Sequence, residues 1–255
     1  MNEQIKLSAI VIAKNEEKNL QLCLLSMSKV IDDIVVLIDS STTDNSFGTA
    51  SSFANVNCEV VKWQGFAKTK SYAVSKTKHD WIFWVDADEE LTEELVDELF
   101  QFKSSNPQFD CYDVARRAFF LGKWIKHSGW YPARIKRLFN KQKVFFDTKE
   151  VHEGLIVNGP IGHLANDLNH YTDPNIEHYF EKYNIYTSLA AKDLSRRGKI
   201  ASKVDILFRP VFLFLKMYIF RLGFLDGLHG FILAMFSSSY VFTKYAKLWE
   251  LSNKK

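Results

Sequence analysis

The stretch Trp81-Ile82-Phe83-Trp84-Val85-Asp86-Ala87-Asp88-Glu89-Glu90 decides how the chain folds around its acids. Its first five residues are apolar, aromatic or β-branched, which predicts a short buried strand. Asp86 and Asp88 follow this strand, and their spacing allows both carboxylates to turn toward one hard cation. Four acids this close together repel one another without a counter-ion. The stretch therefore predicts a divalent-metal site or, as the alternative, a solvated acidic turn before the helix expected from Thr92.

Composition sets the class of protein. The 255 residues are 47% hydrophobic and 25% charged, which is typical of a globular protein. The length suits one large domain, or one domain with an appendage. The net charge of +3 argues against a strongly basic nucleic-acid-binding protein. Residues 201–255 contain 8 Lys and Arg but only 3 Asp and Glu, so the basic excess lies in the C-terminal part.

Cysteine spacing and hydropathy favour an intracellular protein. Cys23, Cys58 and Cys111 form no Cys-X-X-Cys pair and are expected to be reduced core residues. The apolar run over 8–13 is too short for a signal peptide. No apolar run reaches the roughly 18 residues needed to span a bilayer. We therefore expect the chain to remain in the cytoplasm.

Strands and helices alternate along the first 90 residues. The expected strands are 7–13, 34–38, 58–61 and 81–85, and the clearest helices are 16–28 and 66–76. This alternation implies crossover connections and a mostly parallel sheet. Ligands of such sheets bind beyond the carboxyl ends of the strands. Polar residues that follow the strands should therefore gather at one edge, and they are Asn15, Asp39 and Asp86.

Ordered motifs carry a family resemblance. The segments 10–17, 39–44, 63–67 and 84–89 resemble, in order and spacing, the family 2 glycosyltransferases of GT-A fold. Later motifs resemble the branch that contains the β-glucosyltransferases of the lipopolysaccharide inner core, and they are 129–132, 137–139, 151–153 and 170–173. The resemblance implies an α/β fold with a GT-A-type (Rossmann-like) mixed, mostly parallel sheet flanked by helices. It also implies Mg²⁺ or Mn²⁺, UDP-glucose as the donor and a core heptose as the acceptor.

The donor site follows from these expectations. A metal held by Asp86 and Asp88 would stabilise the leaving diphosphate. Asp39 is expected to accept a hydrogen bond from uracil N3–H, with Asn15 and Glu17 at the other polar edges of the nucleotide. Lys70 is expected near the diphosphate as a point charge. The alternatives are helix capping for Asp39 and Asp44, and a solvated helix face for Lys68 and Lys70.

The acceptor side needs a base. An inverting transfer requires one carboxylate on the acceptor hydroxyl, and Glu153 is expected in that role, with Asp147 as the substitute. His152 is expected to contact the metal or a phosphate. Arg137, together with Arg134, is expected to clamp phosphate on the donor or on an anionic acceptor. The aromatic loop 122–132 is expected to shape the acceptor side.

The C-terminal part is expected to be an amphipathic helical appendage. We predict a catalytic domain over 1–200, with its nucleotide-sugar half at about 1–90 and its acceptor half at about 91–200, followed by a membrane-associating segment over 201–255. A helix over 203–221, interrupted near Pro210, places four cations within about 140° beside an apolar face; they are Lys203, Arg209, Lys216 and Arg221. Such a helix lies in a membrane interface. Packing against the catalytic domain and oligomerisation are the alternatives.

The predicted protein is a metal-dependent inverting hexosyltransferase, peripheral on the cytoplasmic face of the inner membrane. Its partners would be a nucleotide-sugar donor, a lipid-linked or lipopolysaccharide acceptor and anionic lipid, and not nucleic acid. Transfer to another surface polysaccharide or to a glycoprotein is the first alternative. A nucleotidyltransferase is disfavoured because the loop 14–17 lacks glycine. An inactive membrane-surface protein is disfavoured because Asp86 and Asp88 are both present.

Overall fold

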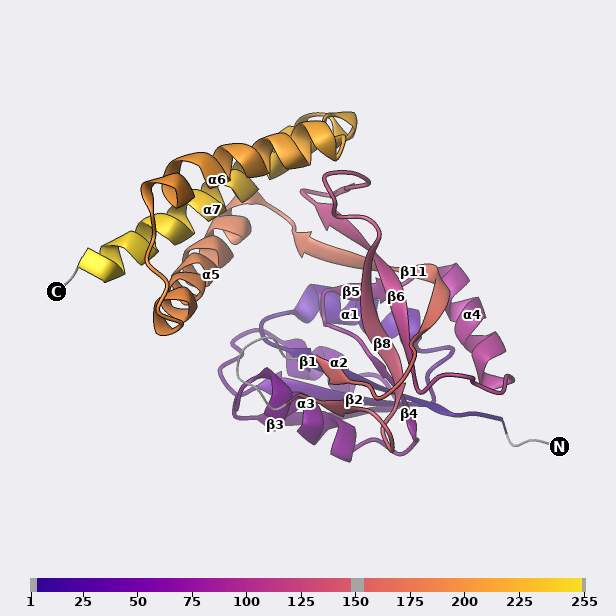
Figure 1. The fold of residues 1–255 in the computed structure, drawn as a ribbon. Helices are drawn as coiled ribbons and strands as arrows, with labels where there is room; N and C mark the ends of the chain where they lie inside the picture. Colours follow the sequence, from indigo (N-terminus) through magenta and orange to yellow (C-terminus); the bar gives the residue numbers. More distant parts are fainter. Residues whose placement is uncertain (1–3, 148–153, 254–255) are drawn as a thin grey trace. The chain divides into compact units, whose positions relative to one another are not determined.

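The chain forms two compact units, described by a computed structural model over residues 4–147 and 154–253. Unit 1 comprises residues 1–116 and 134–170, and unit 2 comprises residues 117–133 and 171–255. Figure 1 labels the principal strands of unit 1 and the long helices of unit 2. Each unit has apolar clusters of its own, so each is held together by its own core.

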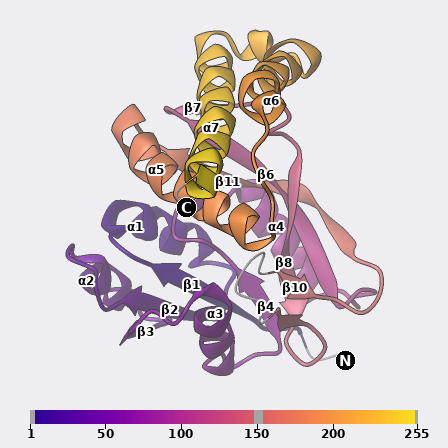
Figure 2. The same ribbon diagram turned by 60° about the vertical axis from the view of Figure 1, so that its left-hand side comes forward.

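Parallel strands form the N-terminal half of the sheet (Figure 2). They lie in the order β3 (Val56–Val61), β2 (Asp33–Asp39), β1 (Leu7–Ala13) and β4 (Trp81–Trp84). In this register Val11 is opposite Val36, and Ile10 is opposite Trp84. Because these strands are parallel, their carboxyl ends meet at the same edge of the sheet.

Helices cover both faces of this half. Val11 of β1 belongs to the core beneath α1 (Glu17–Met27) and α4 (Glu93–Lys103), whereas Ile10 belongs to the core beneath α3 (Phe66–Ser75). This alternation is the period of two that a strand imposes. The short helix α2 (Ser46–Ser51) joins β2 to β3. The helix expected from Thr92 is confirmed, since the Thr92 side chain accepts a hydrogen bond from the Leu95 amide at 3.2 Å.

Antiparallel pairing extends the sheet beyond β4. Strand β8 (Ala133–Asn140) pairs with β4, and the order continues through β6 (Cys111–Phe120), β11 (Gly162–Asp173) and β5 (Glu89–Leu91). Strand β7 (Lys123–Trp124) pairs with β6, while β9 (Phe145–Phe146) and β10 (Leu155–Ile156) form a small second sheet. The expected fold class is confirmed: a mixed sheet is flanked by helices, and further helices follow at the C-terminus.

Unit 2 is mainly helical. It contains α5 (Ile176–Arg196), α6 (Lys203–Leu215), the π-helix η1 (Lys216–Phe220), the 3₁₀-helix η2 (Gly223–Asp226) and α7 (Leu228–Asn253). The interruption expected near Pro210 is wrong, because α6 continues through this residue and the winding changes only at Lys216. The Ser238 hydroxyl of α7 donates to the Pro210 carbonyl at 2.8 Å and ties α7 to α6. Among the residues that the structure describes, no helix is both long enough and apolar enough to cross a bilayer.

A capping box starts α6, and removing it should weaken this unit. The Asp205 amide donates to the Ser202 hydroxyl at 3.1 Å, and the Ser202 amide donates to the Asp205 carboxylate at 3.0 Å. Ser202→Ala is therefore expected to lower the free energy of unfolding by about 1 kcal/mol, measured by urea titration. Ser195→Ala, at an exposed position near the end of α5, is the control and should cost almost nothing. Equal losses in the two variants would contradict the capping role.

Candidate functional site

A tight turn carries the acids away from β4. The Glu89 amide donates to the Asp86 carbonyl at 3.0 Å, and the Glu89 carboxylate accepts from the Asp86 amide at 3.0 Å. Strand β5 then begins at Glu89 and pairs with β11, so that His170 lies opposite Glu89. The turn therefore fixes Asp86 and Asp88 just beyond the carboxyl end of a parallel strand, which is the edge where such sheets bind ligands.

A buried arginine neutralises part of the acid cluster. The Arg137 side chain is 2% exposed, and its Nη2 lies 2.5 Å from Asp86 Oδ2 and 2.6 Å from Glu89 Oε1. Arg116 Nη1 lies 3.6 Å from the same Glu89 oxygen. Burial by itself would raise the pKa of Asp86, but the charges of Arg137 and Lys70 outweigh it and lower that pKa to about 2. The Asp86 carboxylate is therefore ionised at neutral pH.

Glu89 differs from the neighbouring acids because its side chain is fully buried. Burial raises its pKa, although the Arg137 charge opposes this effect. Sequence reasoning grouped Glu89 with the crowded acids of a metal site. The structure instead places it beneath the turn, where it bonds the Asp86 amide and the Arg137 guanidinium. Glu89 thus supports the turn from inside the protein.

Trp84 forms a platform beside Asp86. Its Nε1 donates to Asp86 Oδ1 at 3.1 Å, while the Lys70 ammonium lies 3.8 Å and the Arg137 guanidinium 4.2 Å from its ring centroids. Two cations near one indole ring gain from its quadrupole. Lys70 is 5% exposed, so the solvated-face alternative is wrong for this residue, whereas Lys68 is exposed. Lys70 therefore adds positive charge next to the acid pair.

His170 joins the site from β11. Its Nε2 lies 3.4 Å from Asp88 Oδ2, and the two side chains are 17% and 20% exposed. The segment 170–173 carries part of the family resemblance, but the sequence alone predicts no role for His170. No local signal was available, because the pairing of β5 with β11 is what brings the two residues together.

The acids at this edge suit a cation that also binds phosphate. Across residues 4–147 and 154–253, no three His, Cys, Asp or Glu side chains already form a metal-binding group. Magnesium in nucleotide-binding sites uses one or two carboxylates, with phosphates and water as its remaining ligands. Asp86 and Asp88 retain exposed fractions of 39% and 20% and meet this requirement. The imidazole of His170 lies beside Asp88, with its Nε2 3.4 Å from Asp88 Oδ2. His152 and Glu153 lie outside the described residues.

The loops after β1 and β2 are joined by hydrogen bonds. Asn15, at a φ of 55°, accepts from the Thr43 amide at 2.8 Å. The Glu17 carboxylate accepts from the Asn45 amide at 3.2 Å, and the Glu17 amide donates to Asp44 at 3.0 Å. The two loops therefore form one connected rim. Asp44 also accepts a hydrogen bond from the Ser46 amide at 3.0 Å, at the start of α2. This local contact resembles the helix-capping role given above as the alternative for Asp44.

Asp39 lies at the end of β2 on the same edge. The side chain and amide of Ser41 donate to its Oδ1 at 2.6 and 2.7 Å, and these bonds lower the pKa of Asp39. The residue is 8% exposed and does not reach into α2 to cap it. Asp39 is thus an ionised acceptor held in a turn at the carboxyl edge.

Comparisons with known proteins indicate one family. The glycosyl transferase family 2 model matches residues 8–157. An uncharacterized glycosyltransferase of Rickettsia bellii is 32% identical over 97% of this chain and 87% of its own length. The lipopolysaccharide core biosynthesis glycosyltransferase LpsC of Rhizobium meliloti is 29% identical over 98% of this chain and 94% of its own.

A solved structure supports the fold. The mannosyltransferase PcManGT from Pyrobaculum calidifontis, in complex with GDP-Man and Mn²⁺, aligns with a TM-score of 0.53 and 12% identity, covering 100% of this chain and 89% of that one. At this identity the match shows the fold alone. The family model and the relatives add the chemistry: the chain belongs to glycosyl transferase family 2, whose members transfer a sugar from a nucleotide-sugar donor.

Proposed function

We propose that the protein is a metal-dependent, inverting hexosyltransferase that moves glucose from UDP-glucose to a heptose of a lipopolysaccharide inner core. The observation that carries the proposal is the group formed by Asp86, Asp88, Lys70 and His170 at the carboxyl edge of the sheet. The likeness to LpsC, which is named for lipopolysaccharide core biosynthesis, supports the acceptor. Transfer to another surface polysaccharide is the alternative that an acceptor panel tests.

On the donor side, Asp86 and Asp88 would hold Mg²⁺ or Mn²⁺, with His170 beside Asp88. When bound, the ion stabilises the negative charge that develops on the leaving diphosphate. The Lys70 ammonium adds a second positive charge on the same side. Asp39 is proposed to accept from uracil N3–H, while Asn15 and Glu17 hold the rim that faces the nucleotide. His152 remains a predicted contact of the metal or phosphate.

Arg137 was predicted to contact phosphate directly, and that role stays a prediction. Its burial and its two carboxylate partners favour a positioning role, because the guanidinium is already shared between Asp86 and Glu89. In this role Arg137 keeps Asp86 ionised and fixes the direction of its carboxylate. The contribution to transfer then passes through Asp86.

On the acceptor side, Glu153 is proposed to remove the proton of the acceptor hydroxyl as its oxygen attacks the anomeric carbon. The bond to the diphosphate breaks on the opposite side of the sugar, which inverts the configuration. Asp147 remains the substitute base. Its amide donates to the Gly154 carbonyl at 2.8 Å, which ties it to the chain just beyond Glu153.

Attachment to a membrane surface would bring the enzyme to a lipid-linked acceptor. Large apolar side chains of α6, η1 and η2 are exposed, including Phe208 at 65%, Phe212 at 62% and Phe220 at 72%. An apolar surface of this kind beside cations is typical of peripheral attachment to anionic lipid. We propose such attachment at the cytoplasmic face of the inner membrane, with 201–255 as the associating segment.

The test is turnover with nucleotide sugars and rough-core lipopolysaccharide. Glu153→Gln is expected to lower turnover by about 10²- to 10⁴-fold and leave UDP binding unchanged, because only proton transfer is lost. Asp147→Asn is the matched variant and should retain turnover. Loss of turnover in Asp147→Asn alone would move the base to that residue. If the wild-type protein transferred no sugar to rough-core lipopolysaccharide with any nucleotide sugar, but did transfer one to a different acceptor, the proposed acceptor would be wrong.

A further inference from the structure

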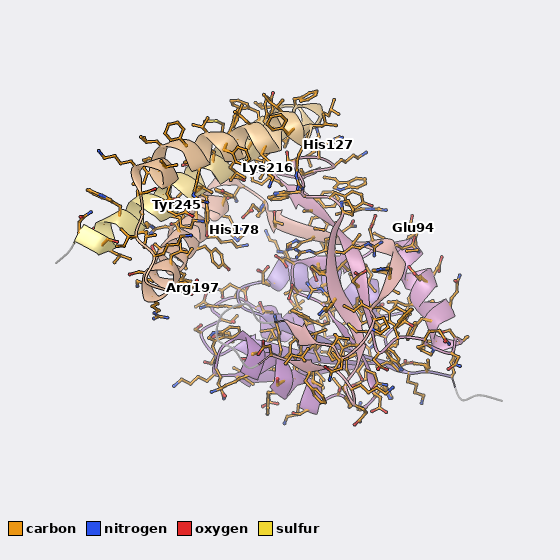
Figure 3. The ribbon with its side chains drawn as sticks, viewed as in Figure 1. Glu94, His127, His178, Arg197, Lys216 and Tyr245 are labelled. Carbon is orange, nitrogen blue, oxygen red and sulfur yellow. The ribbon has the colours of Figure 1, made fainter. Side chains whose placement is uncertain are left out.

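Unit 2 contains a cavity of about 450 Å³ that is not lined by Lys70, Asp86, Asp88 or His170. It is lined by the loop before β8, by α5, by the junction of α6 with η1, and by α7. Its polar and aromatic lining residues are Ser128, Trp130, Tyr179, Lys216, Arg221, Ser237 and Tyr240. No Asp or Glu of the described chain lines it. The cavity therefore has a basic wall, on which Figure 3 labels Lys216.

The two cations of this wall have no counter-ion in the described part of the chain. Neither the Lys216 ammonium nor the Arg221 guanidinium forms an ion pair or a side-chain hydrogen bond with a described residue. By contrast, Arg209 on the preceding helix is paired with Asp205. The Ser128 residue is 4% exposed, and its hydroxyl also has no described hydrogen-bond partner. Both cations are exposed and hydrated in the free protein, and no described acid beside the cavity compensates their positive charge. Such a charged site attracts an anionic ligand.

The loop at the cavity is shaped to accommodate Arg221. Ser128 and Gly129 have positive φ angles of 59° and 78°, and the Ser128 amide donates to the Arg221 carbonyl at 2.9 Å. A Cβ atom added to Gly129 would lie 2.3 Å from Arg221 Nη1. Glycine therefore allows the arginine side chain to lie directly against the loop backbone. The guanidinium is held beside the cavity by this packing.

The other walls suit the neutral part of an amphiphile. Trp130, Tyr179 and Tyr240 present aromatic surface, which packs against the C–H groups of a glycerol or a sugar. Leu213 and Met217 line the cavity from α6 and η1, and the same two helices carry exposed apolar side chains, with Phe212 62% and Phe220 72% exposed. A small anion would contact the cations but not this apolar surface. A lipid with a charged headgroup would use both.

We propose that this cavity binds the phosphate-bearing headgroup of a membrane lipid, with Lys216 and Arg221 on the phosphate and the acyl chains along α6 and η1. The proposal deepens the proposed membrane attachment by giving it a headgroup site. It does not rest on sugar transfer, and it is tested by binding alone. Failure of this experiment would therefore leave the transferase assignment intact, and failure of the turnover assay would leave this site intact.

The experiment is flotation of the full chain with vesicles of phosphatidylcholine, with and without phosphatidic acid. Lys216→Gln/Arg221→Gln is expected to lower partition onto the phosphatidic acid vesicles by about tenfold or more. Lys192→Gln/Lys199→Gln removes the same charge from exposed positions that neither line the cavity nor belong to the segment 201–255, and is expected to change partition less than about twofold. Ser237→Trp, which keeps every charge but fills the cavity lined by Ser237, should lower partition like the first variant.

Three results would overturn the proposal. Equal losses in the two charge variants would mean diffuse attraction to the membrane. Unchanged partition in both Lys216→Gln/Arg221→Gln and Ser237→Trp would mean that the cavity binds no headgroup. If the wild type bound glycerol 3-phosphate but not the phosphatidic acid vesicles, the cavity would be a site for a free phosphate ester and not for a lipid. The circular dichroism spectrum of each variant must match that of the wild type. A loss of partition then comes from the site and not from unfolding.

Discussion

Arg137→Met is expected to lower the free energy of unfolding by about 3–5 kcal/mol. The substitution leaves Glu89 fully buried and Asp86 without its closest cation, because Arg137 is the residue that both carboxylates contact within 2.6 Å. An uncompensated buried charge is among the largest single destabilising effects in proteins. The measurement is urea unfolding followed by circular dichroism at pH 7.

Two further variants make this result interpretable. Arg134→Met removes an exposed arginine from the same strand, whose pair with Asp113 is partly solvated, and should cost no more than about 1 kcal/mol. Arg137→Met/Glu89→Leu removes the buried acid together with its partner and should recover a large part of the stability. If Arg137→Met unfolded no more easily than Arg134→Met, the buried network would not be what holds the turn.

Asp88→Asn is expected to lower kcat/KM by about 10³-fold, the order of effect that follows loss of one group stabilising transition-state charge. Asparagine keeps the size of the side chain but removes the negative charge that a divalent cation requires. Since Asp88 is partly exposed and its one ion-pair partner among residues 4–147 and 154–253 is His170 at 3.4 Å, stability should change by less than about 1 kcal/mol. The measurement is steady-state turnover across a Mn²⁺ series, alongside thermal unfolding.

Glu90→Gln is the matched control for this prediction. It removes one negative charge from the same acidic run, at a residue of β5 that pairs with Asn169 of β11. We expect turnover within about threefold of wild type, because a nearby charge that does not bind the cation contributes only a screened interaction. If Glu90→Gln lowered turnover as much as Asp88→Asn, the effect would be due to the acidic charge in general and not to a specific contact of Asp88 with the metal.

Local patterns were sufficient for the parallel half of the sheet. Short β-branched runs over 7–13 and 34–38 produce buried strands whatever follows them, and the helices between them have clear apolar faces. The antiparallel half depends on pairing between distant segments, such as β8 with β4 and β11 with β5. No period in the sequence encodes these partners. The role of His170 could not be predicted for the same reason.

The acids after β4 show the same limit at the level of single residues. Glu89 and Asp88 are adjacent and chemically alike, yet one is fully buried and the other is partly exposed beside His170. Their difference is set by Arg137, which β8 brings to the inner side of the turn. The sequence predicted that the acids need a counter-charge. It did not indicate that a guanidinium would supply part of that charge from within the protein.

The loop 122–132 is a second example. The loop is expected to shape the acceptor side, and that role stays a prediction; the structure adds that residues 117–133 group with the C-terminal helices in unit 2. There Phe120 and Ile125 share a core with Met217 and Leu233. Tertiary packing of this kind joins segments separated by about a hundred residues, so a pattern confined to the loop cannot reveal it.

The most direct measurement of the central claim is the position of manganese in crystals grown with UDP and Mn²⁺, located by anomalous scattering. The account predicts a peak bound by carboxylate oxygens of the acids beyond β4, Asp88 among them, with the diphosphate of UDP as a further ligand. A manganese peak elsewhere, with UDP beside it and the Asp88 side chain in contact only with solvent, would contradict the account.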